Sequence, residues 1–185
     1  MLWIILIIVV VIIAFIISTY NSLVQSKMKV DNAWSQIDVQ LQRRFDLIPN
    51  FVETVKGYMN HEQETFEKIA ALRTSWANAT TVEDKAELNN QLSSTLKTIM
   101  AVSESYPELK ANENFKQLSE ELSNTENKIS FSRQFYNDTV TMYNEALMVF
   151  PNNIVVSMFG AGKFEEAKFF EIDNEEERKN VKVQF

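Results

Sequence analysis

The residues with the best prospects for chemistry flank Pro49. Five polar side chains lie there within eleven positions: Arg43, Arg44, Asp46, Asn50 and Glu53. If the chain turns at Pro49, Arg44, Asp46 and Glu53 would face one pocket, which suggests a hydrolytic or lipid-modifying site. We prefer a structural interpretation, because carboxylates and arginines also form ordinary ion-pair networks in folded proteins.

A second polar set follows a later helix at near-heptad offsets: Glu126, Asn127, Arg133, Asn137 and Asn144. The three asparagines adjoin apolar positions, where an amide without a partner would cost about 1 to 3 kcal/mol. Such groups commonly fix helix register and oligomeric state. We therefore assign both sets to one structural polar network and predict no catalytic residue.

Other chemical signatures are incomplete. His61 is the sole histidine, and no second histidine follows His61-Glu62 at zinc-protease spacing, so an exposed helical histidine is expected. The chain has no Glu-x-x-His pair and no cysteine, which removes di-iron and thiolate designs. Gly160-Ala161-Gly162-Lys163 lacks the spacing and the Ser/Thr of a phosphate loop, and we interpret it as a turn. We expect no metal and no cofactor.

The elements that position these residues read as helices. Apolar residues recur at spacings of three and four in Val30, Trp34, Ile37, Leu41, Phe45 and Ile48. Pro49 should break this helix, with Asp46 as N-cap of the next one, because proline removes a backbone donor and clashes with the preceding turn. Two antiparallel helices with almost no loop would result.

Three further helices are predicted. The second should run from about Leu47 to Trp76, with Gly57 inside it to allow a close helix approach. Thr80-x-x-Glu83 has the form of a capping box for the third, which Pro107 ends. Asn112 should cap the fourth, which continues to Pro151. With three glycines and three prolines, the chain is expected to be all-α, an elongated antiparallel four-helix bundle with coiled-coil-like crossings.

The first residues predict a membrane anchor. Leu2 to Ile17 is an uninterrupted apolar run that Tyr20, Leu23 and Val24 extend toward the roughly 20 residues that span a bilayer. No basic residue precedes it and no small-x-small cleavage site follows, so we favour a retained transmembrane helix over a signal peptide. It should continue without a break into the bundle. We divide the chain into an anchor (1–24), a bundle (25–151) and a C-terminal segment (152–185).

Charge suggests sidedness and partners. Lys27, Lys29, Arg43 and Arg44 follow the span, which by the positive-inside rule places the N-terminus outside and the C-terminal domain in the cytoplasm. The net charge of −7 argues against a nucleic-acid partner. Asp173 to Lys179 reads as a solvated charge run before a mobile tail.

Helix parity places one more segment. Four antiparallel helices that start at the membrane also return to it, which brings the apolar run after Pro151 to the bilayer surface beside the first helix. Its candidate contact residues are Ile154, Val155, Val156, Met158 and Phe159. We weigh core packing or docking on a neighbouring subunit above insertion into lipid.

Several blocks of the chain resemble the LemA family of bacterial membrane proteins. They are Asn32-Ala33-Trp34-Ser35-Gln36-Ile37-Asp38, Arg43 to Asn50, Glu53 to Tyr58, Tyr106 to Asn112, Glu126-Asn127-Lys128-Ile129, Tyr136-Asn137 with Tyr143-Asn144, and Phe150-Pro151-Asn152-Asn153. The chain departs from the family pattern after Gly160, where Gly162 to Ala167 replaces a shorter link.

The resemblance implies a helical cytoplasmic domain on one N-terminal span, with no established enzyme activity or cofactor. It also implies a loose association with envelope proteases, magnetosome-type organelles and stress responses. Our leading hypothesis is a non-enzymatic scaffold or adaptor at the bacterial inner membrane. Its expected partners are the lipid bilayer, copies of itself and a membrane protein such as an envelope protease, and the enzyme hypothesis at Arg44, Asp46 and Glu53 is the alternative.

Overall fold

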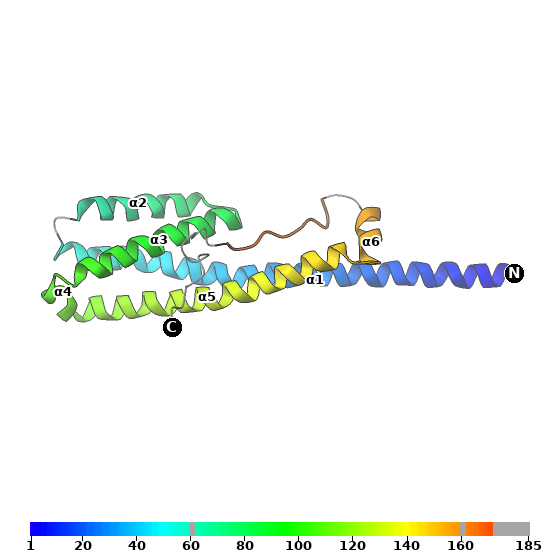
Figure 1. Ribbon diagram of the computed structural model, residues 1–185, viewed down its shortest axis with the longest axis horizontal. Helices are drawn as coiled ribbons and strands as arrows, with labels where there is room; N and C mark the ends of the chain where they lie inside the picture. The colour runs from blue at the N-terminus through cyan, green and yellow to red at the C-terminus, as the bar shows by residue number, and fades with distance from the viewer. Residues whose placement is uncertain (60–61, 160–161, 172–185) are drawn as a thin grey trace, which may run out of the picture. The chain divides into compact units, whose positions relative to one another are not determined.

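The computed structural model describes residues 1–59, 62–159 and 162–171, and these residues form helices and no strand. The predictions for His61 and for the charged tail beyond residue 171 lie outside the described residues. The described residues form six helices, labelled in Figure 1: α1 (Leu2–Lys56), α2 (Gln63–Asn78), α3 (Val82–Ser103), α4 (Pro107–Ala111), α5 (Glu113–Met148) and α6 (Asn152–Phe159). The all-α fold is confirmed.

Two compact units share the chain. Of the described residues, unit 1 contains those within 1–39 and 129–169, and unit 2 contains those within 40–128 and 170–171. Helices α1 and α5 therefore contribute one part to each unit. The division into anchor, bundle and C-terminal segment stays a prediction.

The predicted helix break at Pro49 is wrong. Helix α1 continues for 55 residues with Pro49 inside it, and the chain turns only after Lys56. Asp46 is not an N-cap: it lies within α1, and its carboxylate accepts a hydrogen bond from the side chain of Gln42 at 2.8 Å. The prediction that the N-terminal apolar run continues without a break into the next helix is confirmed.

Tertiary burial explains why α1 passes through its proline. A proline in a helix interior costs about 3 kcal/mol. Phe45, Ile48, Phe51 and Val55 surround Pro49 at helical spacing, and each is at most 3% exposed. Because burying one large apolar side chain contributes about 1.5 to 3 kcal/mol, keeping all four on one continuous face outweighs the proline.

The end of α1 also corrects the assignment of Gly57. This residue lies just after α1 instead of inside a second helix. A Cβ at Gly57 would meet the Thr54 carbonyl oxygen at 3.8 Å, an ordinary van der Waals distance. No close approach of another helix requires glycine here.

The caps of α3 and α5 are formed by side chains. Thr81 caps α3 by accepting a hydrogen bond from the Asp84 amide at 3.1 Å, one residue later than the predicted pair Thr80 and Glu83. Asn112 caps α5 as predicted, with its side-chain oxygen 3.1 Å from the Phe115 amide nitrogen. Pro107 does not end α3, which stops at Ser103, but begins the short helix α4.

Unit 2 is held together by aromatic and aliphatic packing between its helices. Phe45 of α1 stacks on Trp76 of α2, with ring centroids 4.2 Å apart and planes 10° apart. Phe51 of α1 stacks on Phe115 of α5 at 5.8 Å, and Leu92 of α3 is fully buried. All four long helical segments of this unit therefore supply core residues.

In unit 1, α1 and α5 pack antiparallel. Trp34 of α1 contacts Tyr136 of α5, with ring centroids 5.7 Å apart. Nearer the N-terminus, Tyr20 of α1 contacts Phe159 of α6, which follows α5 in the chain. Buried residues at helical spacing line this contact: Leu23, Val30, Ala33 and Ile37 of α1 with Ile129, Tyr136, Val140, Tyr143 and Leu147 of α5.

The first residues of α1 have no such cover. The run from Leu2 to Ile17 is almost entirely exposed. Its large apolar side chains are 48–84% exposed, except for Ile16, which is half-buried. The most apolar 18-residue window of α1 has a mean hydropathy of 3.2 and is 6% buried, which makes α1 long and apolar enough to cross a membrane. Within unit 1, this run passes directly into the packed residues that begin at Thr19 and Leu23.

Replacing Pro49 with alanine should stabilise the protein. The substitution restores the amide that proline lacks, so the Phe45 carbonyl gains its helical donor, while the unfolded chain gains some freedom. We expect Pro49→Ala to raise the free energy of unfolding by about 1 to 2 kcal/mol, measured by chemical unfolding of the full chain in detergent. Asn50→Ala, in the same turn, is the control, and it should change the free energy of unfolding by less than about 0.5 kcal/mol because Asn50 is exposed. A less stable Pro49→Ala variant would contradict this account of α1.

Candidate functional site

The first predicted cluster centres on a buried arginine. Arg44 of α1 is 3% exposed. Its Nη1 donates hydrogen bonds to Asn89 Oδ1 at 2.6 Å and to Ser93 Oγ at 2.9 Å, both on α3. The same nitrogen forms an ion pair with Glu126 of α5, and the Ser93 hydroxyl lies 3.3 Å from Glu126 Oε2. Arg44 therefore connects three helices of unit 2.

Burial and pairing act on Arg44 in opposite directions. Burial lowers the pKa of the guanidinium below its ordinary value, and the carboxylate of Glu126 partly offsets this effect. Arginine stays charged at physiological pH despite such a shift. Its Nε is buried and has no hydrogen-bond partner among the described residues. The cluster thus holds a fixed positive charge whose main compensation is Glu126.

Asp46 and Glu53 do not join this cluster. Successive helical residues turn by about 100°, so Asp46 lies about 200° around α1 from Arg44. Asp46 and Glu53 are both exposed, whereas Arg44 is buried. The hypothesis of one pocket lined by all three required a turn at Pro49, and the unbroken helix separates them instead. Asn50 is exposed too, and its backbone carbonyl accepts from the Thr54 hydroxyl.

Arg43 and Asn127 lie at a neighbouring surface. Arg43 forms an ion pair with Glu121 of α5 at 3.4 Å, and both side chains are partly open to solvent. Together with Asn127 and Lys128 they line a shallow depression of about 380 Å³ on unit 2. The Arg43–Glu121 pair and the Arg44–Glu126 pair have the same residue types, but only Arg44 is buried. Comparing the two pairs therefore isolates the effect of burial on ion-pair strength.

Asn144 holds a distant stretch of backbone. Its side chain accepts a hydrogen bond from the Ala167 amide at 2.9 Å and donates one to the Ala167 carbonyl at 3.0 Å. About two turns earlier on α5, the Tyr136 hydroxyl donates to the Lys168 carbonyl at 2.7 Å. These contacts fix the extended segment 164–169 within unit 1, a role that the heptad interpretation of Asn144 missed. Arg133 and Asn137 are half-buried on the same helix.

Tyr143 lies seven residues after Tyr136 on the same face of α5, but its hydroxyl has a different environment. Its hydroxyl is buried and finds no hydrogen-bond partner among the described residues. Burial, followed by the nearby charges of Asp31 and Glu165, raises the pKa of this phenol above 10.0. The two tyrosines occupy equivalent helix positions, yet of the two only the Tyr136 hydroxyl donates a hydrogen bond to the extended segment within the described residues.

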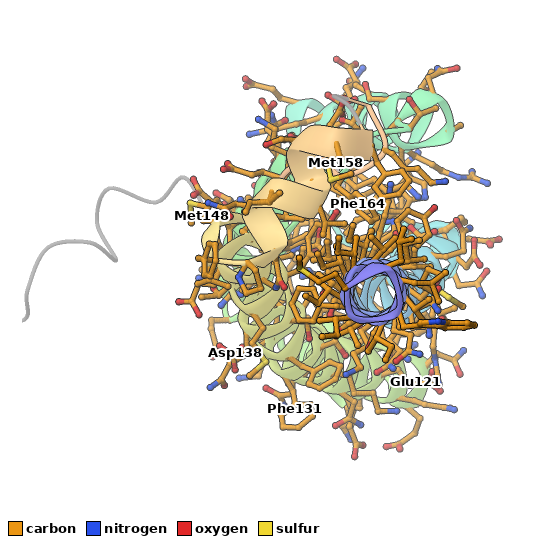
Figure 2. All side chains as sticks on the ribbon, turned by 90° about the vertical axis from the view of Figure 1, so that its right-hand side faces the viewer. Glu121, Phe131, Asp138, Met148, Met158 and Phe164 are labelled. Carbon is orange, nitrogen blue, oxygen red and sulfur yellow. The ribbon has the colours of Figure 1, made fainter. Side chains whose placement is uncertain are left out.

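Helix α6 brings the predicted apolar segment beside α1. Phe159 lies 4.8 Å from Tyr20 and Phe164 lies 5.5 Å from it, measured between ring centroids. Val155 is 2% exposed, whereas Ile154, Met158 and Phe159 are 46–60% exposed. Figure 2 shows α6 next to α1 in the view along α1. The turn predicted after α6 is present at Gly162, whose φ is +112°, while residues 160–161 lie outside the described part.

A second exposed apolar surface lies on α5 of unit 1. Phe131, Phe135 and Met142 are 74%, 48% and 71% exposed. Their spacings of four and seven place them on one helix face, opposite the buried stripe. We name them the α5 stripe; Figure 2 shows Phe131 pointing away from the helices. The sequence carried the signal, since these residues fall between the core positions, but core periodicity alone does not single them out.

Comparisons with known proteins agree on one family. The model of the LemA family matches residues 33–185. Protein LemA from Metamycoplasma hominis (strain ATCC 23114) is 28% identical over 157 residues, which cover 83% of this chain and 72% of that protein.

The two ion pairs of α1 should differ in strength. Glu126→Gln removes the main compensation of a buried guanidinium, which should lower the free energy of unfolding by about 1 to 2 kcal/mol. Glu121→Gln breaks the exposed pair with Arg43 and should cost less than about 0.5 kcal/mol. Chemical unfolding of both variants measures the difference. If both variants lost the same free energy of unfolding, the burial of Arg44 would not determine how much its ion pair with Glu126 contributes to stability.

The two tyrosine hydroxyls should also differ. Tyr136→Phe loses a hydrogen bond and should destabilise by about 0.5 to 1.5 kcal/mol at neutral pH. Tyr143→Phe removes a buried hydroxyl that lacks a partner, and its stability should be unchanged or higher. A raised folded-state pKa adds stability that is complete below the unfolded value and is lost as pH rises past 10.0, so Tyr143→Phe should weaken the alkaline loss of stability. Thermal unfolding from neutral to alkaline pH tests both statements, and equal behaviour of the two variants would refute them.

Proposed function

The chain belongs to the LemA family, and from this premise we propose that it is a membrane-anchored, non-enzymatic helical scaffold. In this proposal α1 holds the protein in the bacterial cell membrane, and the helical units associate with copies of the chain and with membrane-protein partners. A link to envelope stress or membrane organisation belongs to the same proposal.

The observation that carries the proposal is the exposure pattern of α1. A helix of about 20 apolar residues matches the roughly 30 Å of a bilayer core. The 16 apolar residues from Leu2 to Ile17 approach this length and are almost entirely uncovered, whereas the core residues of the same helix from Leu23 onward are buried. In water the uncovered run would expose far more contiguous apolar surface than a soluble protein normally does.

A retained anchor accounts for α1 better than a removable leader. The helix does not end where the apolar run ends, and Thr19 and Leu23 are already packed in unit 1. Cleavage after the run would therefore cut a continuous helix at the point where its core contacts begin. The basic residues Lys27 and Lys29 follow the run, which supports a cytoplasmic location of the helical units.

The α5 stripe supports the scaffold part of the proposal. Exposed apolar residues grouped on one face mark protein contact sites more often than isolated ones do. Aromatic residues and methionine are also enriched in such interfaces. We assign the α5 stripe to self-association, which would leave other surfaces for a partner such as an envelope protease.

The separation of charged groups supports the non-enzymatic part. Arg44 is used inside unit 2, and Asp46 and Glu53 lie exposed on another face of α1. A hydrolytic site needs an acid or base and a charge-stabilising group around one substrate position. These three residues do not provide that arrangement.

Extraction and size analysis test the proposal. The full chain should stay with membranes through an alkaline carbonate wash, leave them in detergent, and elute as a particle of two or more chains by light scattering. Phe131→Ser combined with Phe135→Ser should reduce this particle to one chain, because it removes apolar surface from the α5 stripe. Gln134→Ser, in the same turn, is the control and should keep the assembly. Release by carbonate, or a single-chain particle of the unaltered protein, would contradict the proposal.

A further inference from the structure

One surface of unit 1 is unusual in composition. Between Glu145 and Lys163 the chain has no charged residue, although 23% of the whole chain is charged. Six apolar side chains of this stretch are 46–77% exposed: Met148, Val149, Phe150, Ile154, Met158 and Phe159. We call residues 148–159 the α6 segment. A soluble surface would interrupt such a stretch with charges, so water is a poor match for it.

The place of the α6 segment on α1 is fixed by its aromatic contact. Phe159 packs on Tyr20, three residues after the apolar run ends at Ile17. About 20 helical residues cross the hydrocarbon core of a bilayer, and 20 residues counted from Leu2 reach Asn21. Tyr20 therefore lies at the boundary between hydrocarbon and headgroups when α1 crosses the membrane. Tyrosine is enriched at that depth because its ring is apolar and its hydroxyl is polar.

The direction of α6 suits that boundary. In Figure 1 α6 runs across α1, and in the view along α1 in Figure 2 it is seen from its side. When α1 stands across a bilayer, α6 consequently lies along the membrane surface. Interfacial helices lie in this way, with their apolar side chains in the outermost part of the acyl chains.

Charged residues resume at the depth where headgroups begin. The ammonium of Lys163 lies 5.0 Å from the centre of the Tyr20 ring, and Lys27 donates a hydrogen bond to the Lys163 carbonyl at 3.1 Å. Lys27 lies seven residues beyond Tyr20 on α1, which corresponds to about 10 Å. Lysines placed just outside an apolar surface reach toward phosphate and water.

We propose that the α6 segment is a second membrane-contacting element, an interfacial helix that lies on the bilayer beside the point where α1 emerges. This inference rests on the anchoring role of α1 in the proposed function. It assigns Ile154 and Met158 to the lipid, and Val155 and Phe159 to the contact with the rest of unit 1. The occupant of this surface is lipid, since the contact with Tyr20 puts the segment at the level of the membrane.

A second copy of the chain is a weaker match for this surface. A stable protein interface takes about 800 Å² and 20 to 30 residues from each partner. Helix α6 has eight residues, which is about 12 Å of helix. Lipid contact has no such minimum, because each apolar side chain that enters the membrane contributes separately.

Depth-dependent quenching tests the inference. The chain has no cysteine, so a single introduced cysteine can carry an environment-sensitive fluorophore without other changes. Met158→Cys should be labelled in the full chain and reconstituted at one chain per lipid nanodisc. Its emission should be shifted to the blue and quenched severalfold more strongly by a spin label near the headgroup than by one at the end of the acyl chain. Asp138→Cys, an exposed site on α5 of the same unit, is the control and should show neither effect.

A third position separates failure of this inference from failure of the anchor. Ile8→Cys lies in the middle of the apolar run and should be quenched most by the deep spin label. If Ile8→Cys behaves so while Met158→Cys matches Asp138→Cys, α1 is an anchor and the α6 segment does not touch lipid. If Met158→Cys is shielded but no lipid label quenches it, protein covers the segment and the inference is wrong. If neither position senses lipid, the anchor fails as well.

Discussion

The structure depends on one unbroken helix whose surface changes along its length, from apolar on all sides to apolar on one side. A backbone that crosses lipid must satisfy its hydrogen bonds internally, which a helix does and an irregular chain does not. The first turns of α1 are apolar all around, whereas the turns from Leu23 onward bury one stripe at helical spacing. The transition takes place without a loop. Each unit therefore begins from the same element that is long and apolar enough to enter a membrane.

Polar groups inside the two units do different work. In unit 2 the guanidinium of Arg44 connects α1 with α3 and α5, and a buried charge with specific partners penalises other helix registers. In unit 1 the polar side chains of α5 instead bind backbone atoms of residues 167 and 168. Both arrangements place polar residues beside the core. The Arg44 contacts specify how the helices of unit 2 align, whereas the α5 contacts specify the path of the extended segment 164–169 in unit 1.

The sequence was sufficient for features that depend on local chemistry. Helical periodicity identified most core residues, the Asn112 cap was located to the residue, and the apolar run was recognised from composition alone. Pro49 misled the prediction because its local cost is visible in the sequence, while the burial of Phe45, Ile48, Phe51 and Val55 on one face is a tertiary effect. The shift of the α3 cap by one residue arose because Thr80 and Thr81 have the same capping chemistry. The partners of Asn144 could not be foreseen, since they are peptide groups in a segment with no periodic pattern.

Because α5 binds the extended segment 164–169 through backbone atoms, most side chains of that segment are free to vary. Asn144 and Tyr136 bind the peptide groups of Ala167 and Lys168, which every amino acid except proline supplies in full. The side chains at these two positions are therefore interchangeable as far as this attachment is concerned. Only Phe164, whose side chain is 5% exposed, demands a particular shape within residues 164–169. A link of unfamiliar composition after Gly160 is thus compatible with an unchanged route, because the protein recognises the main chain there and tolerates substitution of its side groups.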